Sequence, residues 1–398
     1  MAERSAIEWT DATWNPIAGC SVVSPGCTNC YAMRMAARLE AVSVAHEARH
    51  GGDPGPLGYY RGLTEPSRAG DVWTGKVVAA PDDVLTKPLR WRKPRRIFVN
   101  SMSDLFHEDV PDAWIDRVFA VAALSARHQL QVLTKRLGRM RDYLSSPNRE
   151  VAVMRAAYDI RRREGACGLE YIDWPLPNVW LGVSVEDQRR ADERIPELLA
   201  TPAAVRWVSA EPLLGPVDLS PFLFIVTHAD DAALACGCSD EPLPFNDPAT
   251  TDPADIATPR LDWVVAGGES GPGARPMHPD WARALRDQCA AAAVPFLFKQ
   301  WGEWAPHRPQ PGGDLGGDVR AGRVQIVHPS GRSHVEVSQA TGGRSTEPGS
   351  RYMALVGKAA AGRLLDGVLH DGFPVPSPRP SPPAPLPDGR GEKAGDHV

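Results

Sequence analysis

The chain has 398 residues, of which 42% are hydrophobic and 23% are charged, and its formal net charge is −5. This length suits either two average domains or one β/α barrel of roughly 250 residues with additions. A slightly negative chain has no overall attraction for nucleic acid, which argues against binding by net charge alone. The N-terminal sequence lacks an apolar leader, and no apolar stretch is long enough to span a membrane. We therefore expect a cytoplasmic protein without a membrane partner.

Three cysteines near the N-terminus are the most informative chemical feature of the chain. Cys20, Cys27 and Cys30 lie in the run WNPIAGCSVVSPGCTNCYA. Pro25 and Gly26 predict a turn, so the six-residue gap between the first two cysteines need not be a long excursion. The apolar stretch that follows predicts that Cys30 opens a helix, whose N-terminus favours negative charge.

Three thiolates this close together predict a metal site with one ligand missing. Structural zinc usually has four protein ligands, whereas catalytic zinc keeps one position open. Iron–sulfur clusters are normally held by four cysteines, so three would leave one iron free for another ligand. The alternatives are a disulfide, which a reducing cytoplasm disfavours, and burial in the core, which the flanking Gly, Pro and Asn disfavour. By contrast, Cys289 lies on a predicted amphipathic helix and is expected in the core.

Short apolar runs, rich in β-branched and aromatic residues, recur along the chain and predict buried strands of a parallel sheet. They cover residues 96–99, 130–133, 179–183, 205–208, 263–266 and 296–298. Helical patterns separate them at residues 112–126, 136–144, 149–163, 188–199 and 279–292. With one strand before Cys20, about seven βα units result. They predict the α/β class, as a partial or complete parallel β/α barrel of the TIM-like type.

Each of these runs ends in a polar cluster, and ligands bind at the C-terminal ends of parallel strands. The clusters begin at Asn100, Thr134, Ser184, Ser209, Gly267 and Lys299. The cysteine loop follows the first strand, so we expect it to meet them at one barrel mouth. Lys135, Glu211 and Glu269 are candidate catalytic residues, and Arg136 and Lys299 are further candidates that face the substrate. For each of them a structural salt bridge is the alternative.

Two segments are predicted insertions into the barrel, which we place at residues 1–305. Residues 49–75 are rich in Gly and Pro and predict a loop over the first unit. Residues 220–260 are rich in Asp, Pro and Ala, and loops of this length are usually functional lids or disordered. The second insertion contains Cys236 and Cys238, which form either an accessory metal site or a pair of loop thiols.

After residue 305 the pattern changes to that of a C-terminal extension. Residues 306–373 predict a β-hairpin, formed by 323–327 and 334–337, and then a short helical segment in VGKAAAGRLLDG. From 374 to 398 proline recurs almost every second residue, which predicts a disordered tail.

Several of these runs carry a resemblance to known families. WNPIAGCSVVSPGCTNCYA, NSMSDLFHEDVP, LTKR, WLGVSVED, SAEPLLGPVDL, AGGESG and KQWGEW resemble a phage-associated three-cysteine-motif family of unknown function. That match extends from residue 5 to about residue 305 and also includes the VGKAAAGRLLDG segment. A cysteine triad after the first strand of a partial β/α barrel also resembles the radical S-adenosylmethionine (SAM) enzymes. Their usual spacing is C-x3-C-x2-C, whereas the spacing here is C-x6-C-x2-C.

The radical SAM resemblance implies an iron–sulfur enzyme of unknown substrate. Cys20, Cys27 and Cys30 would hold three irons of a [4Fe-4S] cluster, and SAM would bind the fourth. An electron donor would then start the cleavage of SAM to a 5′-deoxyadenosyl radical, which is chemistry that the cofactors supply.

The same resemblance assigns four further residues to SAM. Asn100 and Asp104 stand where the superfamily binds the methionyl amine, and Ser184 and Glu186 would suit the ribose and carboxylate. The GGE run that ends at Glu269 resembles a radical SAM element in letters but lies on a late strand. It is therefore interpreted as a place where adenine or substrate approaches the backbone.

Two other functions stay open from the sequence. One is a zinc-dependent hydrolase that uses the three cysteines and a water, with Glu211 or His107 as the base and without SAM. The other is a non-catalytic module of phage origin, in which metal staples a loop that binds nucleic acid or protein. For the enzyme, the nearby cations Lys135, Arg136 and Arg139 point to a nucleic acid or nucleotide as substrate.

Overall fold

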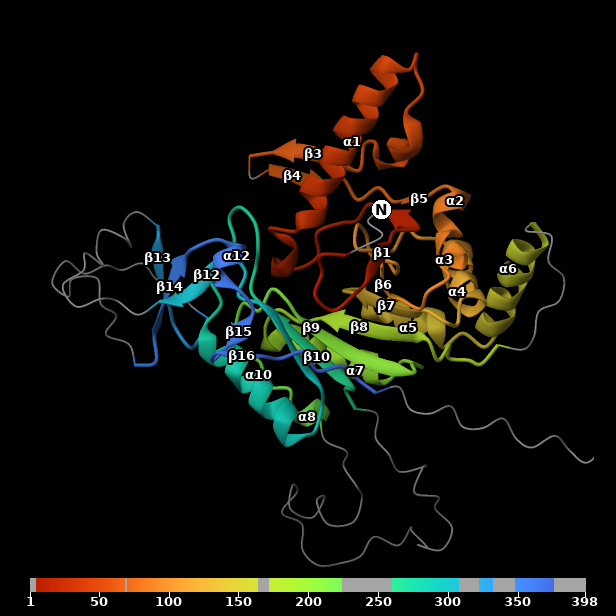
Figure 1. The fold of residues 1–398 in the computed structure, drawn as a ribbon. Coiled ribbons are helices and arrows are strands. Elements are labelled where there is room, and N and C mark those ends of the chain that lie inside the picture. Colours follow the sequence, from red (N-terminus) through yellow and green to blue (C-terminus); the bar gives the residue numbers. More distant parts are fainter. Residues whose placement is uncertain are drawn as a thin grey trace, which may run out of the picture.

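The computed structural model describes residues 5–68, 70–163, 172–223, 260–307, 322–331 and 348–375. Its centre is a seven-stranded parallel sheet of order β1-β6-β7-β8-β9-β10-β11, which curls into a half barrel (Figure 1). The strands are β1 (Ala12–Trp14), β6 (Arg96–Val99), β7 (Gln129–Thr134), β8 (Val179–Ser184), β9 (Val205–Ala210), β10 (Trp263–Gly267) and β11 (Phe296–Gln300). The predicted α/β class and parallel sheet are confirmed. The sheet is open, with β1 and β11 at its edges.

Helices connect these strands, as the alternating pattern of the sequence predicts. Those at the predicted positions are α4 (Asp112–Leu124), α5 (Leu137–Leu144), α6 (Arg149–Arg163), α7 (Gln188–Leu199) and α10 (Pro279–Ala291). Their boundaries lie within two residues of the predicted ones. Shorter helices are α2 (Asp82–Leu85), α3 (Lys87–Arg90) and α8 (Ser220–Leu223). The helices bury one apolar stripe each, as Ile115, Val118 and Phe119 of α4 illustrate.

Aromatic side chains fill the inner side of the half barrel. They form one cluster, in which the ring centroid of Trp9 lies 4.7 Å from that of Phe98 and 5.2 Å from that of Trp207. Trp263 completes the cluster beside Trp207, at 5.2 Å. The neighbouring strand carries Gly182 because a Cβ atom at this position would lie 2.3 Å from the Trp207 ring. The interior is therefore a packed core rather than a channel.

Residues 49–75 form more regular structure than the predicted loop. A 3-10 helix, η2 (Gly55–Tyr60), precedes a hairpin of β3 (Thr64–Ser67) and β4 (Gly70–Trp73), which packs on α1 (Tyr31–Arg49). Buried Leu63 and Trp73 fix it to the helix, which explains the order despite the many Gly and Pro residues. In Figure 1 this unit projects from one end of the sheet. A second small ladder joins β2 (Ile17–Ala18) to β5 (Val78–Ala79).

The C-terminal extension forms a separate antiparallel sheet and then returns to the half barrel. The sheet has the order β12-β14-β13, from β12 (Trp304–His307), β14 (Arg351–Leu355) and β13 (Val324–Val327). The first strand of the predicted hairpin is thus confirmed as β13. The second, at 334–337, lies outside the described residues, as do Cys236, Cys238 and residues 376–398 of the predicted tail.

The last described segment covers the edge strand β11. It follows α12 (Lys358–Ala361) and the hairpin of β15 (Leu364–Leu365) and β16 (Val368–Leu369). Phe298 N donates to His370 O, and Gly372 N donates to Phe296 O, both at 3.0 Å. Open strand edges attract other chains, so this pairing protects the sheet.

None of the helices in the described ranges is long and apolar enough to cross a bilayer.

Replacing Gly182 with alanine tests the packing of the aromatic interior. The new methyl group would meet Trp207, whose ring is held by Trp9 and Trp263, so we expect Gly182→Ala to lower the free energy of unfolding by about 1–3 kcal/mol. Gly138→Ala on α5 is the control, because a Cβ there meets nothing within 4 Å and alanine favours helix. Thermal melts check both variants. Equal melting temperatures for the two would contradict the packing argument.

Candidate functional site

A cavity of about 230 Å³ opens at the C-terminal ends of the sheet strands. Cys20, Cys27 and Cys30 line it together with residues that end strands β6 to β11. The predicted site residues in its lining are Asn100, Asp104, Lys135, Ser184, Glu211 and Glu269. The predicted convergence of the cysteine loop and the polar strand ends is therefore confirmed. Glu186 lies behind the lining and is fully buried.

The cysteine loop contains the turn and the helix start that the sequence predicts. Pro25 to Cys27 form one 3-10 turn, η1 (Pro25–Cys27), and Cys30 is the N-cap of α1. The loop is then attached to the sheet at three points, each through a charged side chain at or beyond a strand end.

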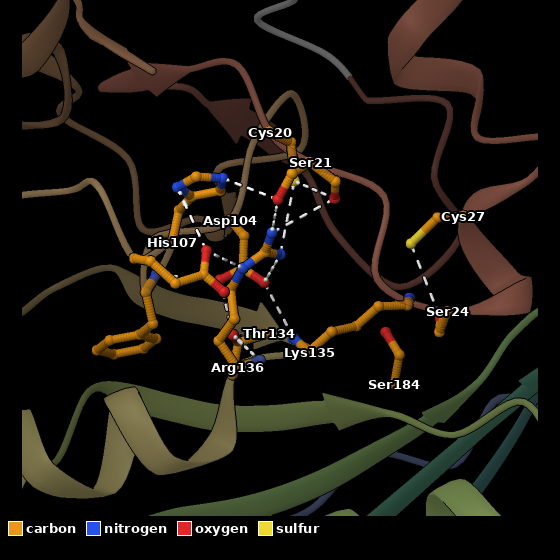
Figure 2. Close-up of polar contacts among 12 residues, drawn as sticks. Cys20, Ser21, Ser24, Cys27, Asp104, His107, Thr134, Lys135, Arg136 and Ser184 are labelled. Carbon is orange, nitrogen blue, oxygen red and sulfur yellow. Dashed lines mark hydrogen bonds and ion pairs between the residues drawn. The ribbon is translucent and has the colours of Figure 1, made fainter. Parts of the chain in front are cut away.

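The first attachment is the guanidinium of Arg136, just beyond β7 (Figure 2). Its Nη1 donates to Asp104 Oδ2 at 3.1 Å and lies 3.6 Å from Cys20 Sγ, while Nη2 donates to Ser21 Oγ at 2.6 Å. Asp104 also accepts hydrogen bonds from Thr134 Oγ1 and the Lys135 backbone. Because these protein groups occupy both carboxylate oxygens, Asp104 serves to position Arg136 and the loop.

The second attachment joins the loop to β8 through Glu186. Ser24 Oγ donates to Glu186 Oε1 at 2.5 Å, and Arg194 Nη1 donates to Oε2 at 2.9 Å. Lys135 Nζ lies 3.4 Å from Oε1. Burial alone would raise the pKa of Glu186, but Lys135 and Arg194 outweigh it and keep this pKa below its usual value. Gly26 packs directly on the carboxylate, where a Cβ atom would lie 2.4 Å from Oε1.

The third attachment joins the loop to the end of β10 through Glu269. Asn29 Nδ2 donates to Glu269 Oε2 at 3.0 Å, and Arg275 forms an ion pair with Oε1 at 2.6 Å. Arg275 also donates to the carbonyl of Pro25 at 2.9 Å. Burial would raise the pKa of Glu269, but the hydrogen bonds from Arg275 and Asn29 hold it below its usual value. Glu269 is therefore an ionised anchor of the loop.

A further ion pair in the cavity lining joins the ends of β9 and β11. Lys299 Nζ, on β11, lies 2.7 and 2.9 Å from the two oxygens of Glu211, beyond β9. Gln300 Nε2 adds a hydrogen bond to Glu211 Oε1 at 3.3 Å. Both members of the pair line the cavity. These two residues thus form a salt bridge and also face the cavity.

The cysteine thiols line the cavity as separate groups. In the described part of the chain, no set of three or more His, Cys, Asp or Glu side chains is arranged to hold a metal ion. Cys27 Sγ lies 3.7 Å from Ser24 Oγ, and Cys20 faces Arg136 (Figure 2). Burial raises the pKa of Cys20 to about 12, with Asp104 adding to the rise and Arg136 opposing it.

Comparison with known proteins adds a family to this geometry. Residues 4–374 match the model of a protein family of unknown function, DUF5131. The chain belongs to this family. No curated protein and no solved structure matches it.

Two further candidate residues lie outside the cavity lining of this DUF5131 protein. His107 is buried, with Nε2 3.0 Å from Ser21 Oγ and Nδ1 accepting a hydrogen bond from Asp109 N. Burial, reinforced by Arg136, lowers the pKa of His107. Arg139 is ion-paired with Asp112 at the start of α4. The basic stretch of the sequence is thus divided among separate carboxylate partners and forms no single patch.

Sequence reasoning missed the partners that fix the cysteine loop. Ser24 and Asn29 stand within the motif but carried no separate signal. Arg194 lies on α7, the helix that follows β8, and Arg275 lies in an irregular segment after β10. Only the fold brings these side chains onto Glu186 and Glu269 in this DUF5131 protein.

The Glu186 attachment gives a pH-dependent prediction. The pKa of this carboxyl is lowered by folding, so it stabilises the protein above its unfolded value of roughly 4.3, and this contribution is lost as the pH falls through the folded pKa. Glu186→Gln leaves Lys135 and Arg194 without their buried anion, and we expect a loss of about 3–5 kcal/mol at neutral pH. Thermal melts between neutral and acidic pH should show the two proteins converging as the pH falls.

Glu193→Gln is the matched control for this experiment. Glu193 lies on α7 and pairs with Arg189 at the exposed surface, so the melting temperature should stay unchanged at every pH. A difference between wild type and Glu186→Gln that stays constant into acid would contradict an ionised Glu186.

Proposed function

We propose that this protein is a radical SAM-like iron–sulfur enzyme, with Cys20, Cys27 and Cys30 as the cluster ligands. One observation carries the proposal: the three thiols line a single cavity at the mouth of a curled parallel sheet, and their loop is fixed to three strand ends. Enzymes place their chemistry at this edge of a parallel sheet, because loop residues there converge on a rigid scaffold.

The donor set fits such a cluster in its chemistry. Three thiolates leave one iron with an open position, as a site for a chelating cofactor requires. The guanidinium of Arg136, 3.6 Å from Cys20 Sγ, favours a negatively charged thiolate. Binding requires the three thiols to turn from their present neighbours toward a common centre.

The remaining cavity residues supply binding and orientation. When bound, the cluster and SAM supply one-electron chemistry that breaks a carbon–sulfur bond of the sulfonium. Asn100 and Ser184 line the cavity and are available to a ligand, whereas Asp104 is bonded to Arg136 and Glu186 to Ser24, so that both support the cysteine loop. Glu269 orients Asn29 and Arg275. Cytoplasmic reducing conditions and an electron donor are part of this proposal.

The Lys299–Glu211 pair and Lys135 are the groups for substrate chemistry in this scheme. Lys299 and Glu211 both line the cavity, where an ammonium group can donate a proton to a substrate or a carboxylate can accept one. We propose a nucleic acid or nucleotide as the substrate. The proposal also includes a TIM-like type of barrel and a phage-associated origin of the protein. A zinc hydrolase receives less support, because His107 lies outside the cavity lining and Glu211 is held by Lys299.

Metal analysis with a SAM-cleavage assay tests the proposal. Protein purified and reconstituted without oxygen should contain iron and sulfide, and with a one-electron reductant it should release 5′-deoxyadenosine from SAM. Cys27→Ala should lose most of the iron and at least 100-fold of the release, because the cluster loses one of three ligands. Cys289→Ala removes a buried core thiol of α10 and should keep both.

Two outcomes contradict the proposal. Colourless protein that contains zinc and leaves SAM intact would favour the hydrolase or the metal-stapled binding module. Release of 5′-deoxyadenosine that survives Cys27→Ala would remove the cluster assignment, even if iron is present.

A further inference from the structure

Asn100 is a buried amide whose hydrogen-bonding atoms have no partner in the described part of the chain. It directly follows β6, lines the cavity and is only 3% exposed. Among the described residues, neither Nδ2 nor Oδ1 has a hydrogen-bond partner. A buried polar group left without a hydrogen-bond partner destabilises the folded protein, so two such atoms on one side chain call for an explanation.

The backbone holds this amide in place. Asn100 has a φ of 59°, in the left-handed region that asparagine tolerates better than most residues. Its N–H donates to Trp14 O at 2.8 Å, and its carbonyl accepts from Ser103 N at 3.2 Å. The main chain is therefore satisfied and fixed, and only the side chain presents free hydrogen-bonding capacity. Unusual backbone at a cavity with an unsatisfied amide is typical of a binding site.

The neighbouring cavity wall is apolar and aromatic. Trp9, Phe98 and Leu133 line it and belong to one hydrophobic cluster. Trp9 and Phe98 are both less than one-tenth exposed, and their ring centroids are 4.7 Å apart. Trp9 Nε1 is also without a partner among the described residues. Rigid aromatic surface beside a donor–acceptor pair suits a flat ring with polar atoms on its edge.

The charges of the lining restrict the ligand further. Its three cations, Lys135, Arg136 and Lys299, are matched by three carboxylates, Asp104, Glu211 and Glu269. Each cation is already paired, at 3.4, 3.1 and 2.7 Å from Glu186, Asp104 and Glu211 respectively. No surplus positive charge remains to bind a chain of phosphates. The cavity therefore favours an uncharged ring.

We infer that Asn100 reads the edge of a nucleobase, and that the substrate of the proposed enzyme is a nucleoside or carries one. An asparagine amide pairs with one donor and one acceptor side by side, as on the adenine edge, and comparable donor–acceptor edges occur on the other bases. Stacking on aromatic side chains strengthens the binding of a base and tolerates different bases. The inference rests on the proposed function and assigns its substrate class.

Equilibrium dialysis of the full-length protein with adenosine, guanosine, cytidine and uridine tests this inference. At least one of them should bind, and its edge-methylated form should bind at least tenfold more weakly because the methyl group blocks the donor. The methylated probes are N6,N6-dimethyladenosine, 1-methylguanosine, N4,N4-dimethylcytidine and 3-methyluridine. Asn100→Gly should weaken the preferred nucleoside at least tenfold and remove the discrimination against the methylated form.

Glycine suits the left-handed backbone at this position, so Asn100→Gly should fold, and a thermal melt checks it. Asn148→Gly, the same change at an exposed site before α6, is the matched control and should bind like wild type. Absence of binding by all four nucleosides would overturn the inference, because solvent then satisfies the amide. Equal binding by Asn100→Gly, or at least tenfold tighter binding of the triphosphates, would also overturn it.

Competition with SAM separates substrate from cofactor. Nucleoside binding that persists in saturating SAM supports the inference, whereas complete displacement would assign the edge reader to the adenine of SAM and overturn it. Iron content and SAM cleavage are measured on the same preparation. Protein that cleaves SAM but binds no nucleoside contradicts this inference alone, and protein that binds nucleosides without holding iron contradicts the proposed function alone.

Discussion

The buried guanidinium of Arg136 connects the parts of the structure on which the cavity depends. It joins Asp104 beyond β6 to Ser21 and Cys20 of the cysteine loop, while its own backbone continues β7 into α5. Glu108 accepts a further hydrogen bond from its Nε at 3.2 Å. A buried cation is stable only when its donors are nearly all satisfied. The position of the first cysteine and the spacing of two strand ends are thus fixed by one side chain.

The other two attachments of the loop follow the same principle at β8 and β10. In each, a carboxylate beyond a strand end accepts a side-chain hydrogen bond from the loop and is neutralised by an arginine from the following segment. The charged residues Arg136, Glu186 and Glu269 at this edge of the sheet therefore position the cysteine loop. Asn100 is different, because its amide is committed to nothing within the described chain.

Local sequence patterns predicted the strands, the helices and the edge at which the cavity opens. Short β-branched runs and amphipathic helices leave a periodic signal, and parallel strands place their C-terminal ends together. The hairpin at residues 64–73 left a weaker signal, because Leu63 and Trp73 become informative only against α1. The partners of Glu186 and Glu269 could not be predicted, because only the three-dimensional path of the chain brings Arg194 and Arg275 into contact with these carboxylates. Asn100 was predicted to bind a ligand, but its lack of protein partners became visible only in the structure.

The contact between Gly26 and Glu186 bears on the unusual length of the cysteine motif. Between Cys20 and Cys27 the chain leaves Arg136, reaches across to β8 and lays Ser24 and Gly26 against the carboxylate. The gap has three more residues than in the C-x3-C spacing of the radical SAM enzymes that the motif resembles. In this structure the residues of the gap reach from Arg136 to Glu186. The segment between Cys20 and Cys27 spans the distance between the ends of the neighbouring strands β7 and β8. A shorter loop between these cysteines would lose the contacts of Ser24 and Gly26 with Glu186, and with them one of its three attachments to the sheet.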